Sequence, residues 1–497
     1  MKKIAIIGIA LAFVLGACQK NLTDLNIDTK NPINAPSYAL FTNGQKYMTD
    51  WLTTSSVDYN ITDLIAQYWT ETTYTDESNY NLGNRDIPKN FWNSLYNDAL
   101  NNFVQAKKLI PTDTDTSLVR NEMDITDIME IYTYYYLLNT FGNLPYTQAN
   151  NIDKYPFPAY DDAKTIYTDL LTRLDTCIAG LNVNNGAFGV ADILYGGNVT
   201  SWKTFANSLK LKMAMLIADT DPATAKTKVG EAIAGGVFQS NADNAIFAYT
   251  GVTPNANPIW VDVIEGNRKD YVIASTLLNS MVTLNDPRRT AYYTNSHSGA
   301  DIGGSVGNNN TWNNYSNIYW PSDSIKGKIT DPGAPSDLLD YSEVSFLLAE
   351  AVERGFISGV AATYYNNAVT ASIEYWGGSA TDAATYLAQP DVAYATAPGG
   401  VGVGTIGSTG VSTTSVQWKQ AIGMQKYLAL YIRGMDAWTE IRRLQYPAMA
   451  VPGTPKSPFP WRYTYPSNEQ TANGTAYKAA AAAIGGDAVT TKLFWMQ

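Results

Sequence analysis

The sequence predicts a mostly α-helical protein in which degenerate helix pairs and long loop-rich regions form one large domain, and three observations support this. Of the 497 residues, 45% are hydrophobic and 16% are charged, a composition that provides for a core and differs from that of disordered proteins. Apolar residues recur at helical spacing from Ser37 onward. The segments between them are rich in Gly, Asn, Ser and Thr, and long loops inside a domain usually carry function. These loop-rich stretches are 70–90, 240–270, 291–336, 391–415 and 450–470.

The first residues predict a secretory leader. Two lysines precede an apolar run over 4–15, and this run is shorter than the about 20 residues that a transmembrane helix needs. The end of the leader, Leu15-Gly16-Ala17-Cys18, resembles the bacterial lipobox, in which the cysteine carries diacylglycerol. An ordinary signal peptide with an accidental cysteine is the alternative.

Lipidation would make Cys18 the anchored first residue of the mature chain. The polar residues that follow contain Asn-Pro and Ala-Pro steps, which are typical of a tether. The remaining cysteine, Cys177, lies in a helical pattern and then has no disulfide partner, so we expect a small buried thiol. The predicted organisation is a lipoprotein signal peptide over 1–17, a lipidated tether over 18–35 and one domain over 36–497.

Helices are predicted along the rest of the chain wherever apolar residues recur three or four positions apart. The second helix is expected to stop at Pro111, because a proline lacks the backbone donor that continues a helix. The third is broken at Phe141-Gly142-Asn143. In chain order the predicted helices cover 35–54, 89–110, 125–146, 160–181, 200–219, 222–236, 342–356 and 358–376.

The clearest helix pair is predicted over 342–356 and 358–376. In the first helix the small residues Ala349 and Ala351 allow a neighbouring helix to approach closely. In the second, Tyr365 lies ahead of a further small residue. This alternation of large and small residues on two neighbouring helices resembles a tetratricopeptide-type pair.

Composition excludes several classes of function. The formal net charge is −11 and the pI is about 4.7, so the chain repels phosphate backbones and is not expected to bind nucleic acid. The chain has one histidine, His297, which argues against a histidine-based triad, a histidine-rich zinc site or a haem ligand pair. We therefore expect no cofactor and no metal site. The 34 tyrosines outnumber the 14 phenylalanines, which suits a wet recognition surface or the general composition of exported bacterial proteins.

Several stretches, in their order along the chain, resemble the SusD/RagB family of outer-membrane nutrient-binding lipoproteins of Bacteroidetes. The lipobox is followed by LTDLNIDTKNP, and YWTETTYTDESNY precedes FWNSLYNDAL. FGNLPYTQA and RKDYVIASTLLNSMVTLNDPRR come next. The series ends with SEVSFLLAEAVERGFISG, QKYLALYIRGMDAWTEIRRLQYP, RYTYPSNEQTAN and GGDAVTTKLFWMQ.

This resemblance implies a SusD-like domain with four tetratricopeptide-like helix pairs and a non-enzymatic function. It implies a lipid-anchored protein on the outer-membrane surface that binds oligosaccharide or polysaccharide. The ligand would be delivered by a hinged lid motion to a SusC-like TonB-dependent transporter. A RagB-like lid of the same architecture that binds peptide is the alternative. In the export tract, Gln19-Lys20 matches the family, whereas Asn21-Leu22 replaces the expected acidic pair.

The first group of candidate glycan-binding residues lies in a polar, loop-rich segment. Sugars are recognised by flat aromatic faces, which cover their C–H faces, and by polar side chains, which bind their hydroxyl groups. For each aromatic residue, packing beneath the loop as part of the core is the alternative. The candidates are Trp69, Tyr74, Asp76, Tyr80 and Arg85.

The second group lies in TWNNYSNIYW, where aromatic residues alternate with Asn and Ser. Such a sequence is atypical of a core, because every buried amide would need hydrogen-bond partners. Packing against a partner protein is the alternative to glycan contact. The candidates are Trp312, Tyr315, Tyr319 and Trp320, and Trp260 in NANPIW is a further candidate.

A glycoside hydrolase remains as an alternative of another class. Glu343 and Glu350 could share one face of the helix over 342–356. Two carboxyl groups about 5–10 Å apart across a cleft can hydrolyse a glycosidic bond. The same spacing also fits the solvated flank of a helix.

Overall fold

The computed structural model describes residues 35–296, 298–318, 329, 331–397 and 415–496. The predicted signal peptide, Cys18 and most of the predicted tether lie outside these residues, as do His297, Tyr319 and Trp320. In the described part of the chain, no helix combines the length and apolar character needed to cross a bilayer.

The described chain is mostly helical, which confirms the predicted fold class. The longer helices are α2 (Ser37–Thr53), α5 (Asn101–Asp113), α6 (Val119–Phe141), α7 (Ala163–Gly180), α8 (Val199–Leu216), α9 (Pro222–Gly235), α12 (Tyr341–Glu353), α13 (Ala361–Tyr375), α15 (Gln417–Ala429) and α16 (Gly434–Leu444). The shorter helices are α3 (Thr62–Ile65), α4 (Ile87–Asn93), α10 (Ser275–Thr283), α11 (Arg289–Tyr292), α14 (Ala380–Leu387), α17 (Ser467–Ala472) and α18 (Gly474–Ala483). Two π-helical segments, η2 (Ser94–Leu100) and η5 (Trp260–Glu265), and 3-10 turns η3 (Gly189–Ala191), η4 (Asn241–Asp243) and η6 (Trp312–Asn314) complete the set.

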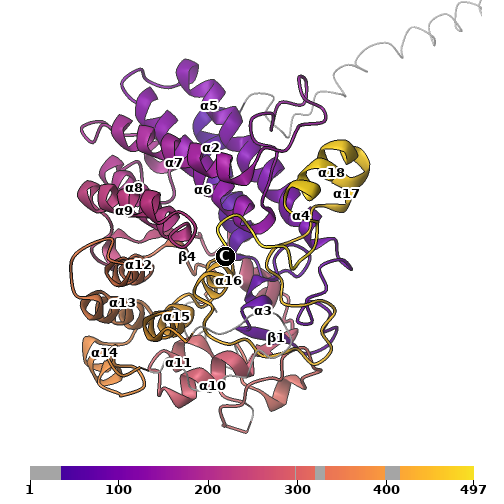
Figure 1. Cartoon of the computed structure of the whole chain (residues 1–497), viewed down its shortest axis with the longest axis vertical. Helices are drawn as coiled ribbons and strands as arrows, with labels where there is room; N and C mark the ends of the chain where they lie inside the picture. Colours follow the sequence, from indigo (N-terminus) through magenta and orange to yellow (C-terminus); the bar gives the residue numbers. More distant parts are fainter. Residues whose placement is uncertain (1–34, 297, 319–328, 330, 398–414, 497) are drawn as a thin grey trace, which may run out of the picture.

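Helices that follow one another in sequence pack side by side. α2 packs on α5, α5 on α6, α6 on α7, α8 on α9, and α12 on α13. In Figure 1 the helices α2, α5, α6 and α7 form one end of the molecule, and α8, α9, α12, α13 and α14 continue along one side. The pair formed by α12 and α13 matches the predicted pair, and the likeness to tetratricopeptide repeats stays a prediction.

Short polar side chains start several of these helices where the sequence places them. Asp162, Asn198, Asp221 and Asp340 accept a hydrogen bond from a backbone N–H in the first turn of α7, α8, α9 and α12 respectively. The predicted stop at Pro111 is wrong, because α5 continues through this proline to Asp113. A proline in the final turn removes one backbone hydrogen bond, and the helix tolerates this loss at its end.

Two small antiparallel sheets connect segments that are distant in sequence. β1 (Trp69–Glu71) pairs with β3 (Tyr271–Ile273), with Trp69 opposite Ile273. β2 (Ala245–Phe247) pairs with β4 (Ser336–Leu339). The loop over 305–317 is attached to β1, since Asn310 donates from Nδ2 to Glu71 O at 3.1 Å. The loop-rich stretches 70–90 and 291–336 therefore meet beside the first sheet.

Many tyrosines belong to the core, which corrects the idea that their excess marks mainly a wet surface. Tyr68, Tyr96, Tyr167, Tyr292 and Tyr365 are buried, and each donates its hydroxyl to a backbone carbonyl. A buried phenol is stable in a core once its hydroxyl is paired. Two of the acceptors, Pro145 O and Val392 O, lie outside helices and strands. The other three lie in the last turns of α8 and α15, where carbonyl groups lack an intrahelical donor. Tyrosine can therefore take the place of phenylalanine in this core.

Candidate functional site

The structure places two of the predicted glycan-binding aromatic residues, Trp69 and Tyr80, inside the core. Each is 1% exposed. Trp69 donates from Nε1 to Tyr431 Oη at 2.9 Å, and Tyr80 Oη accepts from Gln67 Nε2 at 3.0 Å. A ligand needs an open ring face for stacking. In this structure both residues serve the core, and we do not propose them as glycan contacts.

Tyr74, in contrast, is 82% exposed and lies in a closed turn, here called the Tyr74 turn (residues 72–78). Reciprocal hydrogen bonds close it: Glu71 N–H donates to Ser78 Oγ at 3.0 Å, and Ser78 N–H donates to Glu71 Oε2 at 2.8 Å. The backbone of Tyr74 has a φ of 54°, which is uncommon for a residue other than glycine. The predicted residue Asp76 lies in the same turn and is partly exposed.

Two buried carboxyl groups, those of Glu71 and Glu77, lie at the base of the Tyr74 turn. Burial, together with the neighbouring Glu77 carboxyl group, raises the pKa of Glu71 to about 8. Glu77 is paired with Arg85, whose Nε donates to Glu77 Oε1 at 2.8 Å. The same guanidinium donates from Nη1 to Asp58 Oδ1 at 3.1 Å on the surface. Arg85, a predicted site residue, therefore connects the Tyr74 turn with the segment that contains Asp58.

Beside Asp58, two aromatic rings contact each other at the surface in a tilted arrangement. Trp51, near the end of α2, and Tyr59, in the loop after it, have ring centroids 4.4 Å apart and an interplanar angle of 34°. Trp51 donates from Nε1 to Asp98 Oδ2 at 3.2 Å, and Asp98 lies in the π-helical segment η2. Both rings are partly exposed. We call Trp51, Tyr59, Asp98, Asp58 and Arg85 the Trp51–Tyr59 platform.

Sequence reasoning missed Trp51 and Tyr59. The helix over 35–54 was predicted from its apolar spacing, and Tyr59 precedes the first loop-rich stretch. A signal was present, because Asn43, Tyr47 and Trp51 recur four residues apart and so share one face of α2. The structure shows that this face is turned to solvent: Asn43 and Tyr47 are exposed, and Trp51 is partly exposed.

The second predicted group lies on the other side of β1. Trp312 is 8% exposed, and Lys269 Nζ lies 4.9 Å from the centroid of its ring. Tyr315 is partly exposed. Asn317 donates from Nδ2 to Trp312 O at 3.1 Å and to Tyr315 O at 2.8 Å, so a loop amide is used to hold the loop itself. Trp312 therefore offers little exposed surface to a ligand, and Tyr315 offers more.

Trp260, the further predicted residue, is partly exposed at the start of η5. Its segment is attached to the loop after α2, since Asp262 Oδ2 accepts from Thr54 Oγ1 at 2.8 Å and from Ser55 N–H at 3.1 Å. Ser55 O in turn accepts from Tyr271 Oη at 2.7 Å. These bonds bring together the segments that carry Trp260, Tyr59 and Tyr74.

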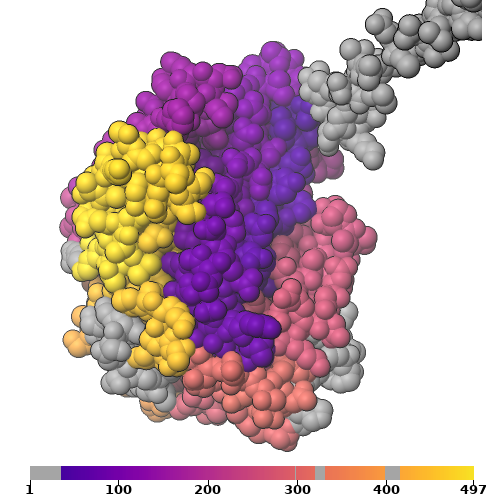
Figure 2. All heavy atoms as spheres, turned by 90° about the vertical axis from the view of Figure 1, so that its right-hand side faces the viewer, coloured from indigo at the N-terminus to yellow at the C-terminus, as the bar shows by residue number. Residues whose placement is uncertain are grey.

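Together these segments form what we call the loop face: residues 51–60, 69–86, 260–271 and 305–317. Figure 2 shows this side of the molecule, with residues of the first hundred running down the centre between the C-terminal segment and the segment around residue 260. Partly exposed aromatic rings lie among carboxylate, guanidinium and amide groups. Chemically, this arrangement can stack on an apolar ring face and bind neighbouring hydroxyl groups.

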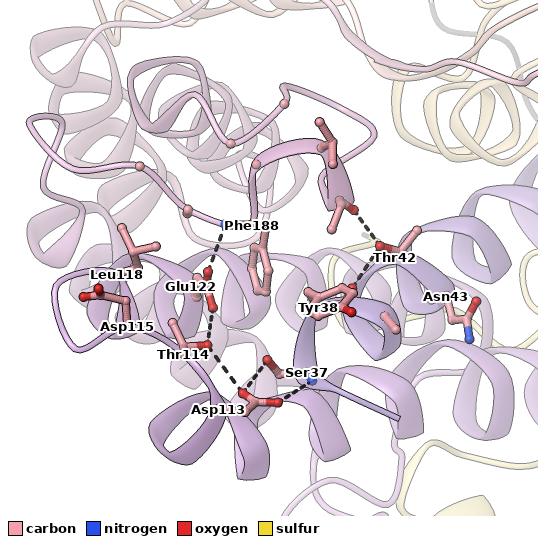
Figure 3. Close-up of a pocket in the computed structure, with 18 residues that line it drawn as sticks. Ser37, Tyr38, Thr42, Asn43, Asp113, Thr114, Asp115, Leu118, Glu122 and Phe188 are labelled. Atoms are coloured by element: carbon pink, nitrogen blue, oxygen red, sulfur yellow. Dashed lines mark hydrogen bonds between the residues drawn. The ribbon is translucent and has the colours of Figure 1, made fainter. Parts of the chain in front are cut away.

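A separate cavity of about 960 Å³ lies at the start of α2, between the end of α5, the start of α6 and the loop over 186–197. Figure 3 shows how internal hydrogen bonds hold its wall. Asp113 accepts from Ser37 N–H at 2.8 Å and Ser37 Oγ at 2.7 Å. Glu122 accepts from Thr114 Oγ1 at 2.7 Å and from Phe188 N–H at 3.0 Å. This cavity contains none of the predicted glycan-binding residues.

The carboxyl groups of Glu343 and Glu350 are placed in ion pairs, not in a cleft. Glu343 Oε1 lies 3.1 Å from Lys212 Nζ, and Glu350 Oε2 accepts from Arg443 Nη2 at 2.6 Å. Burial raises the pKa of each, but the neighbouring cations prevail and hold both values at about 2. A general acid must carry a proton at neutral pH. These two residues therefore do not support the glycoside hydrolase alternative.

No metal centre is present in the part of the chain that the structure describes, in the sense that no three His, Cys, Asp or Glu side chains group in a way that could hold an ion. Cys177, the cysteine among the described residues, is buried, and burial followed by the charge of Asp127 raises the pKa of its thiol. A thiol held in this protonated form is a poor nucleophile. It is a core residue, as predicted.

Comparison with known proteins connects this architecture to a family. Residues 29–466 match the sequence profile of the SusD-like family described as starch-binding and associating with the outer membrane. No curated protein matches the sequence significantly. A SusD homologue from Bacteroides uniformis is 25% identical, with a TM-score of 0.76 over 93% of this chain and 99% of that one.

Two further solved structures share the fold. A protein described as a chitin-binding protein is 24% identical, with a TM-score of 0.76 over 93% of this chain and 99% of that one. A SusD homologue from Flavobacterium johnsoniae, described as chitin-binding, is 22% identical, with a TM-score of 0.75 over 92% of this chain and 98% of that one.

Proposed function

The chain belongs to the SusD-like family, and from this premise we propose that it is a lipid-anchored protein of the outer-membrane surface that binds oligosaccharide or polysaccharide. It delivers the glycan, as a hinged lid, to a SusC-like TonB-dependent transporter. The description of the family as starch-binding and associating with the outer membrane supports the ligand class and the location. The lipobox-like end of the leader supports the anchor at Cys18.

The observation that carries the glycan proposal is the Trp51–Tyr59 platform. Two partly exposed rings, tilted by 34° to each other, provide apolar surface, and Asp98 beside Trp51 together with the Asp58–Arg85 pair provides acceptors and donors at its edge. Asp98 uses Oδ2 to hold Trp51, which leaves Oδ1 for a ligand hydroxyl group. A shallow, preformed site of this kind suits a polymer that must bind and be released.

Further contacts extend the proposed site along the loop face. Tyr74 is open to solvent on its closed turn, and Asp76 lies beside it. Trp260 and Tyr315 are partly exposed, whereas Trp312 contributes at most an edge. From the sequence alone, Tyr319 and Trp320 stay proposed contacts. Arg85 positions Asp58 and is available to the same ligand.

Two of the structural neighbours are described as chitin-binding, and the family is described as starch-binding. Chitin oligosaccharides and malto-oligosaccharides are therefore the first ligands to test. Isothermal titration of residues 19–497 against a panel of these and other polysaccharides should give saturable binding to at least one glycan. No binding to any glycan, together with binding to peptides, would replace this proposal with the RagB-like peptide alternative.

A further inference from the structure

The cavity at the start of α2 lies where the described chain begins. Its wall includes Ser37 and Tyr38, which come directly after the first described residues 35 and 36. The chain before this point leads back to Cys18 through the predicted tether. If Cys18 carries the lipid, as the proposed function holds, the cavity lies at the end of the domain from which the chain leads back to the anchor.

The lining of this cavity is apolar and exposed to solvent. Tyr38 is 55% exposed, and Val190, on the loop over 186–197, has the exposure of an unfolded residue at 101%. Leu118 and Phe188 contribute further apolar surface from facing elements (Figure 3). Exposed apolar surface around a cavity of this size usually indicates a site where a ligand or another protein binds.

Carboxylates surround this apolar lining. Asp113 and Asp115 are exposed, and Glu122 lies deeper in the wall. Among the described residues that line the cavity there is no Lys, Arg or His. Asp115 accepts two hydrogen bonds from Ser117, which lower its pKa, so it is ionised at neutral pH. The site therefore presents negative charge around an apolar centre.

We propose that this cavity is a docking site for a segment of the membrane-embedded partner, in which a Lys or Arg side chain is flanked by apolar residues. The apolar side chains fill the space between Tyr38, Leu118 and Val190, and the cation lies beside Asp113 and Asp115. This inference rests on the proposed function, because the partner must be held in the same membrane as the anchor. Charge complementarity at the rim of an interface contributes mainly to the rate and specificity of association.

Site-specific photo-cross-linking tests this inference on the full-length lipidated protein in cells that express it. A photoreactive residue replaces Val190, and a matched control replaces Val360, which is 64% exposed at the start of α13. We expect a cross-link from position 190, and not from 360, to one outer-membrane protein. Mass spectrometry should place it in a peptide with a basic residue among apolar ones. Cross-links of equal yield at both positions, or at 190 to lipid, glycan or a second copy of this chain, overturn the inference.

Charge dependence gives a second readout. Asp113→Asn together with Asp115→Asn removes two charges, keeps the acceptor for Ser117 and keeps one of the two acceptors for Ser37. We expect the cross-link yield to fall about three- to tenfold. Asp382→Asn, at another exposed capping aspartate, should leave the yield unchanged. An unchanged yield in the double variant overturns the role of the carboxylates. Glycan titration of the same variants separates the two proposals, because the cross-link can persist in a protein that binds no glycan.

Discussion

Arg85 donates from Nε to Glu77 Oε1 at 2.8 Å, and this ion pair connects the two parts of the loop face. On one side, Glu77 lies beneath the Tyr74 turn beside the protonated Glu71. On the other side, the same guanidinium reaches Asp58, next to the ring of Tyr59. A single side chain thus connects the two segments that carry Tyr74 and Tyr59.

Removing this connection should cost stability as well as affinity. Arg85→Gln leaves the buried Glu77 carboxylate without its cation, and we expect the free energy of unfolding to fall by about 1–3 kcal/mol. The control is Arg268→Gln, which removes an exposed arginine whose partner Asp270 is itself partly exposed to solvent, and it should change stability by less than about 0.5 kcal/mol. Urea unfolding at pH 7 measures both variants. Equal effects of the two would contradict the structural role of Arg85.

The raised pKa of Glu71 makes stability depend on pH. In the folded protein burial raises the pKa of Glu71 to about 8 from its ordinary value of 4.5. The folded state therefore binds the proton more tightly than the unfolded state, and the contribution of Glu71 to stability falls as pH rises from about 4.5 to about 8. Glu71→Gln keeps an acceptor for Ser78 N–H and abolishes this titration. Thermal unfolding should show the variant less sensitive to pH than the unchanged protein across this range, with the larger difference at pH 8.

The pKa of Glu350 is shifted in the opposite direction, so its contribution to stability depends on pH in the opposite way. Arg443 and Arg354 hold its pKa at about 2, below the ordinary value of 4.5. Its ion pairs therefore stabilise the protein above pH 4.5, and this contribution is lost as pH falls toward 2. Glu350→Gln leaves buried cations with less compensation and should lower the free energy of unfolding by about 3–5 kcal/mol at pH 7.

The same variant tests the hydrolase alternative. A glycosidase that uses Glu350 would lose turnover on mutation, whereas a binding protein has no turnover to lose. Product analysis after long incubation with chitin and starch oligosaccharides should find no hydrolysis with either the unchanged protein or the variant. Hydrolysis that disappears in Glu350→Gln would contradict the non-enzymatic assignment.

Substitution of Tyr74 should lower the affinity for glycan without lowering the stability of the protein. The φ of 54° at Tyr74 suits glycine better than tyrosine, and its side chain is 82% exposed. Tyr74→Gly should therefore leave the free energy of unfolding unchanged or raise it by up to about 1 kcal/mol. Its affinity for the glycan should fall, because one ring of the site is lost. Isothermal titration and urea unfolding of the same preparation check both expectations, and a loss of stability without a loss of affinity would assign Tyr74 to the fold.

The sequence predicts the helices well, because their signals are local. The α12–α13 pair follows from apolar spacing, and Asp340 starts α12 as a capping residue. Burial of Trp69 and Tyr80 depends instead on distant segments: β3 covers Trp69, and Gln67 with Phe459 encloses Tyr80. Sequence position in a polar stretch does not contain this information.

The Trp51–Tyr59 platform could not be predicted from the sequence either, because it also depends on how distant segments pack. Trp51 lies on a helix whose other face is buried, so its ring could belong to either face until the packing of α2 on α5 is known. The sequence predicts Arg85 as a contact because arginine side chains in a polar loop can bind sugar hydroxyl groups. Its partners, Glu77 and Asp58, become evident only when the Tyr74 turn and the loop after α2 are placed side by side.

The central claim, that the Trp51–Tyr59 platform binds glycan, is tested most directly by isothermal titration of one variant pair. Trp51→Ala combined with Tyr59→Ala is compared with Tyr47→Ala, which removes a tyrosine that is 38% exposed on the same helix. With the glycan found in the panel, the account predicts that the double variant binds at least about tenfold more weakly and that Tyr47→Ala binds normally. Circular dichroism confirms that both variants are folded. Normal affinity in a folded double variant would contradict the account.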